Sequence, residues 1–186
     1  MNLTHQKFAA IFLISALVVI CLVAEIDAQD KKDLPVLASE NLDKKYVDWS
    51  FLKQNVEVSS FYRSYFKNGV PSLVKGDFDG NGLEDMAALV AYPNTIYSEK
   101  SISHLYDLVV LLNKKNNYQL VIIESKIPEN DIVYLSLIKK GTSIAEFDSA
   151  KTFLLKNDSF SFSFFEKAGS VYYFMNGKFH TVTTSD

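Results

Sequence analysis

The apolar positions of the chain follow two periods, and these predict a short helical region before a longer β-rich region. From Ser39 onward, apolar residues recur at spacings of three and four, which is typical of one face of a helix. These residues are Leu42, Tyr46, Trp49, Leu52 and, at the far end, Val56. Ser39 or Asn41 would cap the start of this helix, because short polar side chains can accept hydrogen bonds from the first free N–H groups.

Short apolar or alternating runs between turn residues indicate β-strands in the rest of the chain. The expected strands cover residues 72–75, 86–92, 106–112, 118–124, 131–138, 152–155, 159–164, 171–175 and 178–183. Phe and Ser alternate strictly in 159–164, which places three Phe rings on one face. The turn Asn176-Gly177 gives the last two strands a strong hairpin signal.

Short turns join these strands and therefore favour antiparallel pairing, since parallel strands need long crossovers. We expect an α+β fold in which β-structure is dominant. Its strands would form an antiparallel, meander-like sheet, with an N-terminal helix packed on one face.

The start of the chain has the features of an export signal. His5 and Lys7 give a weakly basic beginning, residues 8–24 carry no charge, and Ala28 is a small residue after the apolar core. The alternative is an uncleaved membrane anchor, because about 20 apolar residues can span a bilayer. We expect a signal peptide over residues 1–28, a polar linker over 29–40 and a single α+β domain over 41–186. The location would be periplasmic, cell-surface or secreted.

The composition narrows the choice of partners and compartment. The 186 residues include 19 Lys and Arg against 22 Asp and Glu, for a net charge of -3, and no basic stripe suggests nucleic-acid binding. The single cysteine, Cys21, lies in the apolar segment. Because Ile20 before it is not small, we do not expect lipidation there. The exported part would then lack disulfides, which fits a bacterial envelope.

The stretch KGDFDGNGLED, residues 75–85, concentrates oxygen-bearing side chains around three glycines. Counted from Asp77, side-chain oxygens fall at positions 1, 3, 5 and 9, and Gly82 stands at position 6, where a sharp turn is needed. Calcium takes six to eight oxygen ligands, and alternate side chains can surround it as a loop wraps.

We therefore expect a Ca²⁺ site in this loop. The expected ligands are the side chains of Asp77, Asp79, Asn81 and Asp85 and the main-chain carbonyl of Leu83. Asp85 would close the site, because position 12 is Ala88 and not the Glu of an EF-hand. The alternative is a turn-rich loop without metal, in which Asp, Asn and Gly serve conformation alone.

The segment GDFDGNGLED resembles the calcium loop of FG-GAP/VCBS-type repeats, which reads GDFNGDGxxD and is followed by a strand. The resemblance implies Ca²⁺ binding by the same five residues, with Asp79 where Asn is common and Asn81 where Asp is common. Only one copy is present, so the resemblance does not imply the β-propeller that such repeats usually form. Residues 165–174, Gly177-Lys178-Phe179 and the terminal Ser185-Asp186 are similar to the ending of small exported bacterial proteins with one such loop.

These patterns favour a non-catalytic calcium-binding domain. The exported part has only two histidines, His104 and His180, which lack the partners of a zinc site or a catalytic triad. The membrane would be contacted only through the signal segment, if that segment is uncleaved.

Two other functions stay open. The first is an envelope interaction or inhibitor module that binds a protein or a glycan, in which the acidic loop is only a turn. Tyr62 with Tyr65, or Tyr172 with Tyr173, could form its platform. The second is a carbohydrate-active enzyme that uses a pair of carboxylates. The candidates for that pair are Glu124, Glu129, Asp131, Glu146, Asp148 and Glu166.

Overall fold

The structure is a computed structural model that describes residues 34–52, 72–95, 104–128, 133–147, 151–164 and 169–184. The chain divides into two compact units, Met1–Pro35 and Val36–Asp186, and the helix and strands named below all belong to the second unit. In the described part of the chain, no helix has the length and apolar character needed to cross a membrane.

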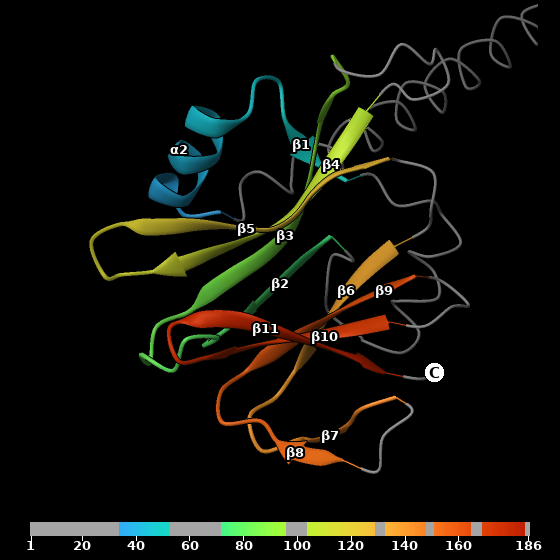
Figure 1. The fold of residues 1–186 in the computed structure, drawn as a ribbon. Helices are drawn as coiled ribbons and strands as arrows, with labels where there is room; N and C mark the ends of the chain where they lie inside the picture. Colours follow the sequence, from blue (N-terminus) through green and yellow to red (C-terminus); the bar gives the residue numbers. More distant parts are fainter. Residues whose placement is uncertain are drawn as a thin grey trace, which may run out of the picture. The chain divides into compact units, whose positions relative to one another are not determined.

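The described elements are one helix followed by strands (Figure 1). In chain order they are α2 (Val36–Lys45), β1 (Ser50–Phe51), β2 (Leu73–Gly76), β3 (Asp85–Pro93), β4 (His104–Asn113), β5 (Tyr118–Pro128), β6 (Val133–Ile138), β7 (Ser143–Ala145), β8 (Thr152–Leu154), β9 (Ser159–Phe164), β10 (Gly169–Met175) and β11 (Lys178–Thr184). Among the described residues, 60% belong to strands and 9% to the helix. The predicted α+β class with dominant β-structure is confirmed.

The strands are distributed over two main sheets and a small ribbon, and every pairing is antiparallel. The first sheet has the order β1-β3-β4-β5, with β2 also paired to β3. The second has the order β11-β10-β9-β6, and β7 pairs with β8 in the ribbon. The meander expected from the sequence is present in both sheets, as β3-β4-β5 and as β9-β10-β11.

The main core lies between the two sheets. Leu89 of β3 and Leu108 of β4 belong to the same buried cluster as Phe160 and Phe162 of β9. Phe164 is partly buried against this cluster, so the three rings of β9 face the core as predicted. The two sheets therefore share one hydrophobic core, as in a β-sandwich.

A second, smaller cluster lies on the outer face of the second sheet. Val171 of β10 and Val182 of β11 contact Ile144 of β7 and Leu155, which follows β8. Because neighbouring residues of a strand point to opposite faces, Val171 lies in this cluster while Tyr172 lies in the main core. The ribbon thus covers part of the face that the main core leaves open.

The helix differs from its prediction. It covers Val36–Lys45, so its first half lies in residues assigned to the linker, and Ser39 and Asn41 lie inside it. The Asn41 side chain donates to the Leu37 carbonyl and therefore does not cap the helix start. Lys44 and Lys45 lie in the last turn, where cations interact favourably with the helix dipole.

Trp49 and Leu52 are buried although they do not belong to the helix. The chain turns through Asp48, whose φ is 52°, and then continues as β1, which pairs with β3. The apolar spacings of three and four in this region therefore come from the end of a helix followed by a short strand, and not from one longer helix. Val56 lies outside the described residues.

A buried carboxylate on β4 attaches the end of α2 to the first sheet. The hydroxyl of Tyr46, just after the helix, donates to Asp107 Oδ2 at 2.8 Å, and Tyr92 of β3 donates to Oδ1 at 2.7 Å. The N–H of Lys126 also donates to Oδ1, at an irregularity in the pairing of β4 with β5. Burial, followed by the hydrogen bond to Asp107, raises the pKa of Tyr46, so this hydroxyl stays a donor.

We predict that Tyr46→Phe lowers the free energy of unfolding by about 1–3 kcal/mol, because it leaves a buried charged acceptor with one donor fewer. Urea denaturation measures this change. Tyr173→Phe is the matched control, since no hydrogen bond of the Tyr173 hydroxyl is found among the described residues. We expect the control to stay within about 0.5 kcal/mol of the natural protein. Equal effects of the two substitutions would contradict the assigned role of Asp107.

Candidate metal centre

The acidic loop connects β2 to β3 in a hairpin. Gly76, the last residue of β2, pairs with Asp85, the first residue of β3, so residues 77–84 form the connection. Gly80 and Gly82 adopt φ angles of 77° and 83°, a left-handed conformation that glycine adopts without strain. The two strands expected on either side of the loop are present.

Three of the five expected ligands come together as carboxylates. Asp77, Asp79 and Asp85 each offer one oxygen, and these oxygens all lie within 4.8 Å of one another. Calcium binds oxygen at about 2.3–2.6 Å, so two oxygens on one ion are separated by at most about 5 Å. The three carboxylates therefore fit inside a single coordination sphere and could hold a metal ion.

Asp85 is fully buried and fixes the loop through its backbone contacts. Its Oδ2 accepts from the N–H groups of Phe78 at 2.8 Å and Asp79 at 3.3 Å. Its Oδ1 accepts from the N–H of Asn113 at 2.7 Å, at the end of β4. Burial raises the pKa of Asp85 to about 6, although these hydrogen bonds act in the opposite direction.

The raised pKa means that the folded protein holds this proton more tightly than the unfolded chain does. As the pH rises through about 6, the contribution of Asp85 to stability therefore falls and then stays low. When it is ionised, the loop carries an electrostatic cost, because three carboxylates lie close together. A bound cation would offset that cost directly.

The two carboxylate oxygens of Asp77 differ in their hydrogen bonds. Its Oδ2 accepts from the N–H of Gly82 at 3.0 Å. Its Oδ1 is buried and has no hydrogen-bond partner among the described residues. An unsatisfied buried acceptor is costly, so this oxygen is the atom of the loop with most to gain from a ligand.

Asp79 is held by a lysine that the sequence did not indicate. Its Oδ1 accepts from the N–H of Asn81 at 3.1 Å, and its Oδ2 forms an ion pair with Lys114. Lys114 lies in the turn between β4 and β5, far from the loop in sequence. The ammonium group therefore supplies one positive charge to the acidic cluster.

The other two expected ligands, the Asn81 side chain and the Leu83 carbonyl, lie on the same loop and are not carboxylates. Asn81 Oδ1 accepts from the N–H of Leu83 at 2.7 Å, and its amide nitrogen donates to the Asn113 carbonyl at 2.9 Å. Leu83 is half-buried and lies outside the main core cluster. Phe78 is the anchor, because it is fully buried with its ring centroid 5.2 Å from that of Phe160.

A second support comes from the segment before β9. The side chain of Asn157 donates to the Phe78 carbonyl at 3.3 Å, and Asp158 accepts from the N–H of Asp77 at 3.4 Å. Burial opposes ionisation of Asp158, but hydrogen bonds from the Lys140 N–H and the Lys139 side chain outweigh it and lower its pKa. The loop is therefore attached to both sheets.

The other predicted candidates are scattered or lie outside the described residues. His104 is exposed at the start of β4, and His180 stacks on Tyr173. Tyr172 is buried in the core, so it does not form a surface platform with Tyr173.

Among the expected acids, Glu124 accepts a hydrogen bond from Tyr172, and Glu146 lies beyond β7. The remaining four acids and the other two tyrosines lie outside the described part of the chain, at Glu129, Asp131, Asp148, Glu166, Tyr62 and Tyr65.

Comparison with known proteins adds no assignment for this site. No protein-family model, curated protein or solved structure matches the chain. The geometry of the loop and the resemblance of its sequence are therefore the grounds for a functional proposal.

We predict that Gly80→Ala destabilises the protein more than Gly82→Ala. Both glycines have positive φ angles, which cost an alanine about 1–2 kcal/mol. A Cβ at Gly80 would also lie 2.6 Å from Asn157 Oδ1, whereas a Cβ at Gly82 would meet nothing within 4 Å. We expect an additional loss of about 1 kcal/mol for Gly80→Ala, because Asn157 must leave its hydrogen bond to Phe78.

Urea denaturation of both variants in EDTA measures the difference without any contribution from metal. Equal destabilisation would show that Asn157 does not constrain the loop.

Proposed function

We propose that this protein is an exported, non-catalytic domain that binds Ca²⁺ in the loop between β2 and β3. The observation that carries the proposal is the buried, unpartnered Oδ1 of Asp77 beside the carboxylates of Asp79 and Asp85. Donors that are all oxygen favour a hard cation. The spacing of Asp77, Asp79, Asn81, Leu83 and Asp85 supports Ca²⁺, because it resembles the FG-GAP/VCBS-type calcium loop.

The proposed role of the ion is structural. It would join the end of β2 to the start of β3 and cancel the repulsion among three carboxylates. Phe78 connects the same loop to the main core, and the Asp77 N–H connects it to Asp158 next to β9. Calcium would thereby stabilise the region where the two sheets meet. An exported protein would meet this ion in the periplasm, at the cell surface or outside the cell.

One observation favours a metal-free loop, which is the part of the interaction-module alternative that concerns this site. Lys114 already pairs with Asp79, and Asp85 already accepts three backbone hydrogen bonds. These contacts could satisfy most of the loop without an ion. They leave Asp77 Oδ1 unexplained, however, and for that reason calcium binding is the leading proposal.

We predict that calcium raises the melting temperature of the natural protein relative to EDTA. Binding at a hundredfold excess over Kd stabilises the fold by about 2.7 kcal/mol, which corresponds to about 5–10 °C for a domain of this size. Asp77→Asn should remove most of this rise, because it withdraws one charge while keeping an acceptor for the Gly82 N–H.

Glu84→Gln is the matched control, since Glu84 lies in the same loop with its side chain 66% exposed and is not an expected ligand. Calorimetric titration with Ca²⁺ and Mg²⁺ gives the affinities directly. An unchanged melting curve in calcium and in EDTA would exclude the proposal.

We predict opposite effects of Lys114→Met on stability and on calcium affinity. In EDTA the variant should be less stable, because Asp79 loses its counter-ion. Its calcium affinity should rise about threefold or more, because the ammonium no longer competes with the ion for the carboxylates.

Lys115→Met is the control, because it removes a neighbouring lysine for which no ion pair is found among the described residues. A metal-free turn would instead make Lys114→Met equally destabilising in calcium and in EDTA.

A further inference from the structure

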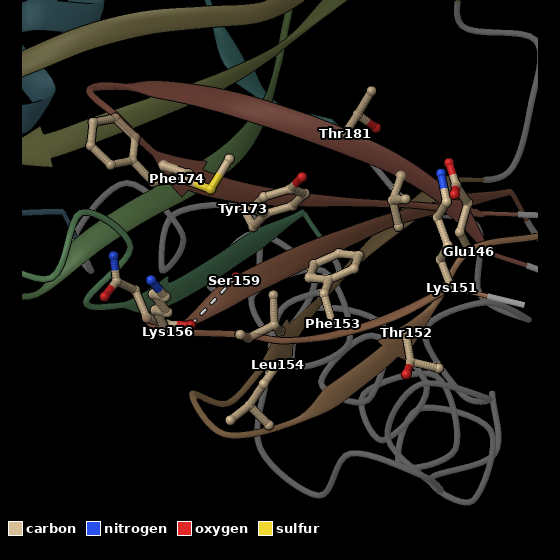
Figure 2. A pocket seen from close by; sticks show the side chains of 14 residues that line it. Glu146, Lys151, Thr152, Phe153, Leu154, Lys156, Ser159, Tyr173, Phe174 and Thr181 are labelled. Atoms are coloured by element: carbon tan, nitrogen blue, oxygen red, sulfur yellow. Dashed lines mark hydrogen bonds between the residues drawn. The ribbon is translucent and has the colours of Figure 1, made fainter. Parts of the chain in front are cut away.

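A pocket of about 540 Å³ lies between the ribbon of β7 and β8 and the outer face of the second sheet. Figure 2 shows its lining, which comes mainly from β8, β10, β11 and the segment that follows β8. Small-molecule sites commonly measure about 300–1,000 Å³. The three clustered carboxylates of the candidate metal centre do not line this pocket.

The walls of the pocket are largely apolar and aromatic. The rings of Phe153 and Tyr173 lie against each other with centroids 4.9 Å apart, and Leu155 and Val182 are buried beside them. Two further lining residues stay in contact with water, since Leu154 is 65% and Met175 41% exposed. An apolar ligand would remove some of this surface from water, and that removal favours binding.

The charged residues of the lining lie at opposite ends. Glu146 and Lys151 lie together at one end (Figure 2), where the Glu146 N–H also donates to the Lys151 carbonyl. Their opposite charges offset each other. Lys156 lies at the other end (Figure 2), and no carboxylate pairs with it among the described residues. The lining therefore carries a surplus of one positive charge.

A weakly bound hydroxyl adds to this positive end. Ser159 is only 1% exposed, and its hydroxyl reaches the Asn157 carbonyl at 3.5 Å (Figure 2). This distance is near the limit for a hydrogen bond, so the hydroxyl is free to donate to a nearer acceptor. Lys156 and Ser159 together offer a cation and a donor to an anionic group.

We propose that this pocket binds a small monocarboxylate with an aliphatic or aromatic body. The body would lie against Phe153 and Tyr173, and the carboxylate would lie at Lys156 and Ser159. An amine would be repelled by Lys156, and a second negative charge would find no unpaired cation in the lining. This proposal does not depend on calcium binding.

The test is a calorimetric titration of the full-length protein in EDTA with decanoate, decylamine and decanol, which share one chain and differ in the head group. We expect decanoate to bind one-to-one and at least about tenfold more tightly than decylamine. Lys156→Met should reduce decanoate affinity to about that of decanol. Adding Ser159→Ala to this variant should weaken decanoate binding further. Lys178→Met is the matched control, because this exposed lysine of β11 lies outside the lining.

Three outcomes would overturn the proposal. These are no saturable decanoate binding, equal affinity for decanoate and decylamine, and the same loss of affinity in Lys156→Met and Lys178→Met. Circular dichroism verifies that each variant is folded. The comparison of head groups in the natural protein decides the question even if a variant fails to fold.

Discussion

The buried carboxylate of Asp85 fixes the position of the acidic loop, because each of its oxygens accepts backbone hydrogen bonds from a different part of the first sheet. Oδ2 holds the loop itself through Phe78 and Asp79, and Oδ1 holds the end of β4 through Asn113. A carboxylate in such a place is costly when ionised, and its raised pKa reflects this cost. The concentrated negative charge of this loop, at the edge of the core, therefore needs positive charge nearby to balance it.

The structure offers two partial answers within the chain. Lys114 supplies one positive charge to Asp79, and backbone N–H groups supply partial charges to Asp77 and Asp85. Neither reaches Asp77 Oδ1. A single lysine therefore leaves three neighbouring carboxylates under-compensated, whereas a divalent cation would neutralise two charges and occupy the free acceptor. This difference is the physical reason for placing calcium ahead of a metal-free turn.

The sequence predicted most strands because their apolar runs are separated by strong turn residues. Residues 159–164 and the hairpin around Asn176-Gly177 are clear cases, since local alternation and turn chemistry agree there. The helix was misplaced because the buried residues Trp49 and Leu52 flank the short strand β1 and do not belong to a continuing helix. Local spacing does not distinguish these two causes of burial. The division of the strands over two sheets depends on long-range pairing, which local patterns do not encode.

The same distinction applies to the candidate site. The three aspartates were found because they lie within one short loop. Lys114, Asn113, Asn157 and Asp158 were missed because β4, β5 and β9 bring them to the loop from distant positions. The residues that decide whether the loop needs a metal are thus largely the ones that only the tertiary structure reveals.

The segment from Lys156 to Ser159 connects the two proposed sites. Asn157 contributes to the lining of the pocket and donates to the Phe78 carbonyl, and Asp158 accepts from the Asp77 N–H. An ion that ordered the loop would also restrict this segment, and with it the polar end of the pocket. Because such coupling is reciprocal, a ligand at Lys156 and Ser159 would alter calcium affinity by the same factor as calcium alters the affinity for that ligand. A single calcium loop would then have a reason beyond local stability, since it would adjust the affinity of a neighbouring binding site that also binds its ligand without calcium.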